Sequence, residues 1–520
     1  MGWVRVKKIK RQSDLPSHRI DSWRKTGFAR VPAIAHPIRL LFAAAIVVGA
    51  FCSAFVFGQA KDPLDSSKVL KLTTFATHSS ASSPEAAIDL THPRDGSGRI
   101  FVSTNEGRIH AFSSSGKTLE TFLDFNTAQV ADFEATVDFT TNGLSYIAFH
   151  PDYARAGAPG EGKLYTFYKS RMPGTRAPDY SGAALATRPG DVLSQYVLVE
   201  WTVDGNDPNR IDTESRREVM RIEFSGPAVT VHSIGEISFN PFSRPGQADY
   251  GNLYITAGDA FAGGALKNFQ FVQDRDNPFG KVLRINPLQK GDAPYSVPSD
   301  NPFQDDGPLL DDDDNAEEIF AWGLRYPQNF SFAMNARKNP RLIVFDIGAT
   351  DFEEVNIVDL GDNHGWTLYR GPVEGNPKTK LNLPSRSRLE FPAAVYDHTI
   401  PNVPGGTPEK RSAAITGGFV VSDPGDPGFQ QQLVFGDLAC CAFFHADFEE
   451  LLAADAANTQ APVHVMAVSV DGGPPGLFCD SIGKDRGDVR FGVDEKGRLF
   501  LISKQSNTIY LTDLIADQGP

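Results

Sequence analysis

The feature that most constrains the fold is a repeated phrase of two short strands joined by a polar turn. It reads DGSGRIFVSTNEGRIHAF at residues 95–112 and DEKGRLFLISKQSNTIYLTD at residues 494–513, and the two copies align over their whole length. Each strand alternates apolar and polar residues, which is the period-2 pattern of a strand with one buried face. Strand-turn units repeated along a chain indicate radial repetition, as in a β-propeller.

Weaker copies of this pattern lie between the two ends of the chain. They are GEGKLYTFYK at 160–169, DYGNLYITAGD at 249–259, NPRLIVFDIG at 339–348 and QQLVFGDL at 431–438. EELLAADAAN at 449–458 is about the only clear helix signal, and 47 glycines and 36 prolines favour short strands joined by turns. We therefore expect an all-β fold. An array of β-sandwiches is the competing fold, but it would show a more regular spacing.

The two ends of the chain are expected to meet. Matching first and last phrases suit the closure of a ring, with a strand near Val69–Phe75 completing a blade built from the C-terminal residues. The spacing of the repeats exceeds that of a minimal blade, so long loops must lie between the strands. We expect residues 61–520 to form one propeller domain.

The first 60 residues predict an export segment. Lysines and arginines precede an apolar run, Leu40 to Phe57, and a small-residue cleavage site follows at Gly58-Gln59-Ala60. The run is also long enough to span a bilayer, so residues 40–57 could instead remain as an inner-membrane anchor. Both alternatives predict an exported protein, periplasmic or extracellular, that meets a membrane only through this segment.

The charge of the chain argues against a nucleic-acid partner. It has 50 lysines and arginines against 64 aspartates and glutamates, a formal charge of -14, whereas nucleic acids and anionic membranes require clustered positive charge. The acidic run at 305–318 lacks the glycine and the spacing of an EF-hand loop, so we expect a solvated charge run there.

Three cysteines lie beyond the export segment, which itself contains Cys52. They are Cys440, Cys441 and Cys479. An exported protein can keep disulfides, so either Cys440 or Cys441 could pair with Cys479, or the two neighbours could pair with each other. The sequence leaves these alternatives open, and one thiol remains unpaired.

A histidine stands at the end of one predicted strand. GLSYIAFHPDY at 143–153 places an apolar strand, Leu144 to Phe149, directly before His150-Pro151. The proline removes a backbone donor and fixes a turn. His150 is therefore either a packed histidine at a strand end or a proton acceptor held rigidly at the edge of a pocket.

The motifs, taken in order, resemble the glucose/sorbosone dehydrogenase family, which comprises six-bladed β-propellers related to soluble sugar dehydrogenases dependent on pyrroloquinoline quinone (PQQ). They are HPRDGSGRIFVSTNEGRIHAF, GLSYIAFHPDY, GKVLRINP, EEIFAWGLRYPQNFSF, FEEVNIVDLGDNHGW, AITGGFVV and DVRFGVDEKGRLFLIS. The resemblance runs from about residue 70 to the end. It implies a six-bladed propeller with long inter-strand loops that oxidises a sugar hydroxyl, with hydride transfer to the quinone.

The resemblance also implies roles for particular residues. His150 would be the general base, and Arg325 and Gln328 would contact PQQ. Trp366 and Arg486 would stand at further cofactor positions, and the backbone carbonyls of Gly348 and Ala349 would hold the calcium ion that polarises PQQ. Guanidinium and amide groups suit the carboxylates and carbonyls of the quinone.

The sequence departs from the family pattern at three positions. Tyr326 stands where the family commonly has asparagine, no lysine occurs near Ala439-Cys440, and KDRGDV at 484–489 replaces an Arg-x-Arg-Asp-Val motif. PQQ carries three carboxylates, and each lost charge-assisted contact is worth roughly 1.5–3 kcal/mol. Lys267, Lys281 and Arg370 are the candidates for replacing the missing cations.

Three functions are therefore open. The first is an exported dehydrogenase that depends on PQQ and calcium, takes an aldose or a related sugar, and passes electrons to an unknown acceptor. The second is a non-catalytic propeller that binds a carbohydrate or another ligand and has lost PQQ. The third is a hydrolase or lactonase that uses loop carboxylates such as Asp351, Glu353 and Glu354.

Overall fold

The computed structural model describes a set of ranges from residue 65 onward. These are residues 65–77, 85–135, 143–171, 176–183, 191–227, 232–260, 271–304, 315–374, 389–400, 409–410 and 413–518. The chain divides into two compact units, and the one formed by Lys10–Phe57 lies outside these ranges, as does the whole predicted export segment. In the described part of the chain, no helix is long and apolar enough to cross a membrane.

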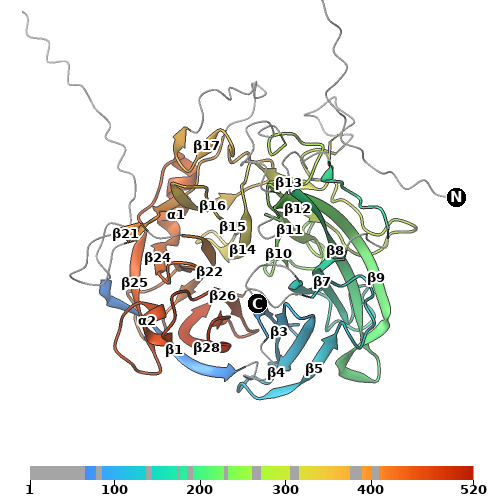
Figure 1. Cartoon of the computed structure of the whole chain (residues 1–520), viewed down its shortest axis with the longest axis horizontal. Helices are drawn as coiled ribbons and strands as arrows, with labels where there is room; N and C mark the ends of the chain where they lie inside the picture. Colours follow the sequence, from blue (N-terminus) through green and yellow to red (C-terminus); the bar gives the residue numbers. More distant parts are fainter. Residues whose placement is uncertain are drawn as a thin grey trace, which may run out of the picture. The chain divides into compact units, whose positions relative to one another are not determined.

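Antiparallel sheets dominate the described residues (Figure 1). The first sheet holds β2 (Ala87–Thr91), β3 (Ile100–Thr104), β4 (Arg108–Phe112) and β5 (Thr118–Asp124). The second holds β6 (Leu144–Phe149), β7 (Lys163–Ser170), β8 (Asp191–Asp204) and β9 (Asp207–Pro227). The third holds β10 (Ile234–Phe239), β11 (Leu253–Ala257), β12 (Lys281–Ile285) and β13 (Ile319–Trp322). The fourth holds β14 (Pro327–Met334), β15 (Pro340–Asp346), β16 (Phe352–Val358) and β19 (Ala394–Asp397).

The C-terminal strands and the first strand form one sheet of eight strands. Its members are β1 (Asp65–Thr77), β22 (Ile415–Ser422), β23 (Gln432–Asp437), β24 (Phe443–Asp447), β25 (His464–Val470), β26 (Val489–Val493), β27 (Arg498–Ser503) and β28 (Thr508–Ala516). Two small hairpins pair β17 (Tyr369–Arg370) with β18 (Val373–Glu374), and β20 (Thr399–Ile400) with β21 (Glu409–Lys410). The helices are α1 (Phe448–Ala457) and α2 (Phe478–Ile482).

Six strands line the centre of the ring: β2, β6, β10, β14, β22 and β26. Each packs against the next in this order, and β26 packs against β2, so the contacts close a circle. The arrangement confirms the predicted all-β, propeller-like fold. The number of six blades stays a prediction, because the eight-stranded sheet runs unbroken through two of these inner strands.

The strands and the helix expected from the repeated pattern are confirmed. The phrase at 95–112 forms β3 and β4, the phrase at 494–513 lies in β27 and β28, and the four weaker copies contain β7, β11, β15 and β23. The predicted helix at 449–458 is α1. It begins after Asp447, whose carboxylate accepts a hydrogen bond from the backbone N–H of Glu450, and ends at Asn458 in the left-handed conformation.

Strand β1 joins the two ends of the described chain, as the sequence predicts. It pairs antiparallel with β28, where Leu72 lies opposite Thr512, and parallel with β25, where Leu70 lies opposite Val468. The side chains of Leu70 and Leu72 are each 1% exposed, whereas Lys71 between them faces solvent. Backbone hydrogen bonds and buried leucines therefore hold the ring closed.

We expect Leu72→Ala to lower the free energy of unfolding by roughly 2–4 kcal/mol, because it leaves a cavity where β1 meets the C-terminal strands. Lys71→Ala is the matched control on the solvent side of the same strand and should change stability by no more than about 0.5 kcal/mol. Urea unfolding followed by tryptophan fluorescence measures both values. Equal losses in the two variants would show that the buried face of β1 does not close the ring.

Candidate functional sites at the two ends of the channel

The inner strands define two chemically different ends of the channel. A cavity of about 280 Å³ is lined by residues from the C-terminal halves of β2, β6, β10, β14, β22 and β26. The six strands therefore run in the same direction and end around this cavity. Residues that directly precede the inner strands lie at the opposite end. We call these the C-terminal end and the N-terminal end of the channel.

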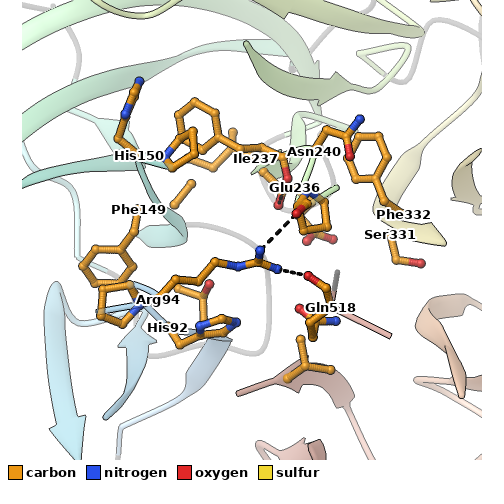
Figure 2. Close-up of a pocket in the computed structure, with 18 of the residues that line it drawn as sticks. His92, Arg94, Phe149, His150, Glu236, Ile237, Asn240, Ser331, Phe332 and Gln518 are labelled. Carbon is orange, nitrogen blue, oxygen red and sulfur yellow. Dashed lines mark hydrogen bonds between the residues drawn. The ribbon is translucent and has the colours of Figure 1, made fainter. Parts of the chain in front are cut away.

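His150 lies at the C-terminal end, directly after β6. Its Nδ1 accepts a hydrogen bond of 3.0 Å from the backbone N–H of Asp152, and its ring packs edge-on against Phe239 with the ring centres 5.3 Å apart. Burial lowers the pKa of His150 to about 4. Figure 2 shows the ring pointing away from Arg94 and Gln518 in the cavity. The contacts are those of a neutral, packed histidine that closes a turn.

Arg325 lies at the N-terminal end, two residues before β14. Its Nη1 donates to the backbone carbonyls of Ile347 at 2.8 Å and Gly348 at 2.7 Å. Its guanidinium stands 5.7 Å from the ring centre of Trp366. The structure thus brings together Arg325, Gly348 and Trp366 from the predicted site. It does not bring His150 to them, since none of these three lines the cavity beside His150.

The remaining predicted site residues lie apart from the cavity beside His150. Gln328 is buried at the start of β14, and among the described residues its side-chain oxygen has no hydrogen-bond partner. The side chain of Arg486 is 51% exposed and donates to Asp488. Ala349 follows Gly348 in the turn between β15 and β16. The roles assigned to these residues and to His150 stay predictions.

A histidine and a carboxylate that sequence reasoning missed lie beside Arg325. The Nδ1 of His232, two residues before β10, is 2.7 Å from Oδ1 of Asp259, which follows β11. The other oxygen of Asp259 accepts from the indole N–H of Trp366 at 3.0 Å, and its backbone N–H donates to the carbonyl of Arg325. The ring of His232 stacks on Tyr326 with the ring centres 4.9 Å apart.

The electrostatics of this pair suit proton transfer. Burial alone would raise the pKa of Asp259, but the charge and the hydrogen bond of His232, with Arg325 and Trp366, bring it below its usual value. An ionised Asp259 orients the imidazole and stabilises its protonated form, which is the relation of a base to the group that positions it. The side chain of His232 remains 12% exposed.

The comparisons with known proteins fit this architecture. A family model described as Glucose / Sorbosone dehydrogenase matches residues 85–421. The chain belongs to the glucose/sorbosone dehydrogenase family. The soluble aldose sugar dehydrogenase of Escherichia coli, solved in its apo form, is similar in fold, with a TM-score of 0.52 at 16% identity over 86% of this chain and all of that one.

Curated relatives carry different names. The HIPL1 protein of Arabidopsis thaliana is 29% identical over 67% of this chain and 50% of its own length. The Hedgehog-interacting protein of Mus musculus is 25% identical over 46% of this chain and 29% of its own length. The chain thus spans about half or less of these curated relatives, and family membership alone does not assign an activity to it.

The described residues of this family member do not fit PQQ and calcium. The carbonyl of Gly348, the implied calcium ligand, already accepts from Arg325. Lys281 is fully buried and donates to the backbone carbonyls of Val272 and Phe279, and Arg370 lies 3.4 Å from Asp351. Lys267 lies outside the described residues.

Buried carboxyls reinforce this conclusion. Asp346 accepts from the backbone N–H groups of Arg325 and Tyr326, and burial raises the pKa of Glu354 to about 7. Glu353 bonds to His398 at 2.9 Å, and this hydrogen bond raises the pKa of His398. Burial raises the pKa values of Asp346, Glu353 and Glu354, and these residues offer the carboxylates of PQQ no positive charge.

One of the open cysteine pairings is now fixed. Cys441 forms a disulfide with Cys479, and Cys440 is a free, buried thiol. The bond tethers the turn between β23 and β24 to α2, at the N-terminal end of the channel. Where the family pattern has a lysine, this chain thus has a neutral crosslink.

Two carboxyls face the cavity from the inner strands. Asp89 of β2 accepts from the backbone N–H of Ile147, and Glu236 of β10 accepts from the backbone N–H of Phe330, each at 3.0 Å. Burial raises the pKa of Asp89 to about 7 and that of Glu236 to about 8, with the charge of Asp89 adding to the effect on Glu236 and Arg490 opposing it. Glu236 therefore favours the protonated form at neutral pH, where Asp89 is about half protonated.

We expect the free energy of unfolding to fall as pH rises from about 5 to about 8. Both pKa values are higher in the folded than in the unfolded chain, so the folded state binds more protons in this window. Glu236→Gln should flatten the decline and exceed the wild-type stability at pH 9 by roughly 1–3 kcal/mol. Urea unfolding at several pH values measures this, with the exposed Glu214→Gln as control. A steeper decline in Glu236→Gln would contradict the assignment.

Proposed function

We propose that this protein binds a small hydroxyl-rich ligand of the sugar class at the N-terminal end of its channel, without PQQ or calcium. The observation that carries the proposal is the position of Arg325. One guanidinium nitrogen donates to the carbonyls of both Ile347 and Gly348. The arginine thereby places a positive charge at the carbonyl of Gly348, where the family resemblance implies calcium.

A calcium ion would need these oxygens to face it. Calcium takes six to eight oxygen ligands at about 2.3–2.6 Å. A guanidinium within hydrogen-bond distance of Gly348 occupies that carbonyl and repels a divalent cation. Arg325 is also the residue expected to contact the quinone. Its bonds to the backbone carbonyls therefore both exclude calcium and occupy the arginine that PQQ would need.

Residues around Arg325 suit a neutral polar ligand. The half-buried Arg325 and the 12% exposed His232 offer hydrogen-bonding groups, and the ring of Tyr326 stacks on His232 beside them. Sugars are recognised by polar groups in fixed positions together with flat aromatic faces. Family membership supports a sugar-class ligand over a peptide or a nucleic acid.

The pair formed by His232 and Asp259 favours a second candidate function. Its geometry is that of a base and its orienting carboxylate, so the protein would be a PQQ-dependent oxidoreductase: His232 would take the proton of a sugar hydroxyl while the hydride passes to the quinone. For either function we also propose that residues 1–60 direct export. We further propose that the eight-stranded sheet counts as two blades, which gives six in all.

We expect calorimetric titration with PQQ in the presence of calcium to give no binding, and dye-linked assays on a sugar panel to give no turnover. At least one sugar should bind, and Arg325→Gln should weaken that binding by about 10-fold or more, since it removes a charged donor. Arg210→Gln, an exposed arginine on β9, is the matched control.

Dye reduction that depends on PQQ would overturn the binding proposal. His232→Asn then separates the two candidates, because a catalytic base affects turnover far more than ligand affinity. Loss of turnover at unchanged sugar affinity would assign His232 as the base. The absence of both sugar binding and turnover in the folded protein would remove both candidates.

A further inference from the structure

Two arginines, Arg94 and Arg244, line the cavity at the C-terminal end of the channel. Arg94 donates to the backbone carbonyls of Pro241 and Gln518, and Figure 2 shows the bond to Gln518. Arg244 makes only long contacts, of 3.4 and 3.3 Å, to the carbonyls of Pro241 and Ser243. Among the described residues, the hydrogen bonds of both guanidiniums go to backbone carbonyls.

These two charges act on each other. Burial lowers the pKa of Arg94 to about 10, and the neighbouring Arg244 adds to this effect, while the attraction of Asp517 only partly offsets it. Two guanidiniums that line one cavity are unfavourable unless an anion neutralises them. The site therefore has a charge requirement that the described side chains do not meet.

The backbone at Arg94 is also unusual. Arg94 has a φ of 54°, in the left-handed region that non-glycine residues rarely adopt. Such a conformation costs of order 1–3 kcal/mol and persists where the surrounding structure holds it, often at ligand sites. Here it directs the guanidinium across the cavity from the loop that follows β2 (Figure 2).

Further polar groups in the cavity wall have no partner in the described residues. The Nδ1 of His92 and the Oγ of Ser331 are buried and unpaired, and both residues line the cavity. Figure 2 shows the His92 ring beside Gln518 and Arg94. Buried polar atoms are normally hydrogen-bonded, so unpaired atoms around an empty space indicate groups that await a ligand.

The rest of the wall is aromatic. Phe149, Phe239 and Phe332 line the cavity from β6, β10 and β14, and the inner strands β22 and β26 add Phe419 and Phe491. Towards the channel interior lie the carboxyls of Asp89 and Glu236. The cavity thus combines a cationic side, an apolar aromatic wall and an acidic inner side.

We propose that this cavity binds a small organic monocarboxylate, with its carboxylate between Arg94 and Arg244 and an apolar or aromatic body against the phenylalanines. Guanidinium groups recognise carboxylates through charge-assisted hydrogen bonds. A volume of about 280 Å³ is at the small end for ligand pockets, which suits a single ring. Asp89 and Glu236 bring no positive charge to the inner side of the cavity, so a ligand with one carboxylate fits better than a dianion.

Benzoate and benzyl alcohol test this proposal, because they share a ring and differ in charge. We expect calorimetry to show that benzoate binds the full-length protein and that benzyl alcohol does not. Arg94→Gln and Arg244→Gln should each weaken benzoate binding by about 10- to 100-fold, the loss expected for one charge-assisted contact. Arg210→Gln, whose side chain is 66% exposed on β9, should leave the affinity unchanged.

Inorganic phosphate and gluconate complete the experiment. Phosphate that binds more tightly than benzoate would overturn the aromatic part of the proposal, and gluconate that binds more tightly would replace the aromatic body with a hydroxylated one. No binding of any of these anions to the folded wild type would overturn the proposal outright. If Arg94→Gln does not fold, Arg244→Gln and the wild-type comparison of benzoate with benzyl alcohol still decide it. The site lies at the opposite end from Arg325, so its outcome is independent of the proposed function.

Discussion

The pairing of β1 with β28 is the constraint on which the rest of the structure depends. Residues more than 400 positions apart in the sequence become neighbours through this ladder, as with Leu72 and Thr512. With the ring closed, the six inner strands pack side by side around one axis and end around the same cavity. Both candidate sites consist of loops attached to the two ends of these strands, so their geometry follows from closure and not from local sequence.

Because the inner strands run in the same direction, they place different functional residues at the two ends of the channel. Residues that precede a strand, such as His232 and Arg325, meet at one end, and residues that follow a strand, such as Arg94 and His150, meet at the other. At the N-terminal end Arg325 lies near the ionised Asp259, which also holds His232. At the C-terminal end Arg94 and Arg244 repel each other, and among the described residues their hydrogen bonds go to backbone carbonyls. One end of the fold thus sets its cation beside a carboxylate, whereas the other carries the proposed anion site.

The sequence predicted the strands well, because each carries the period-2 pattern that depends only on neighbouring residues. The family resemblance placed Arg325, Gly348, Trp366 and His150 in one site. Arg325 does contact Gly348 and Trp366, but His150 lies at the other end of the channel, since the end that a residue reaches depends on strand direction around the closed ring. The partnership of His232 with Asp259 requires the register of β10 against β11, where Ile234 lies opposite Ala257. A histidine before one strand and an aspartate after the next was the available signal. The contact of Arg325 with Gly348 leaves no trace in residue types, because a backbone carbonyl has no side-chain signature.

The contact of Arg325 with the β15–β16 turn shows how a chain can keep the fold of its family without the cofactor site of that family. A single side chain can occupy the carbonyls of a cation site and remove a cation from a cofactor site without disturbing the strands that hold both. The hydrogen bonds of the His232–Asp259 pair do not involve the guanidinium of Arg325, although its charge helps to lower the pKa of Asp259. A chain could therefore lose quinone binding and still keep a well-oriented histidine. For this reason the histidine pair alone does not decide between a protein that binds a sugar and an enzyme that oxidises one. The contact of Arg325 with the backbone carbonyls, in contrast, argues against the binding of calcium and PQQ.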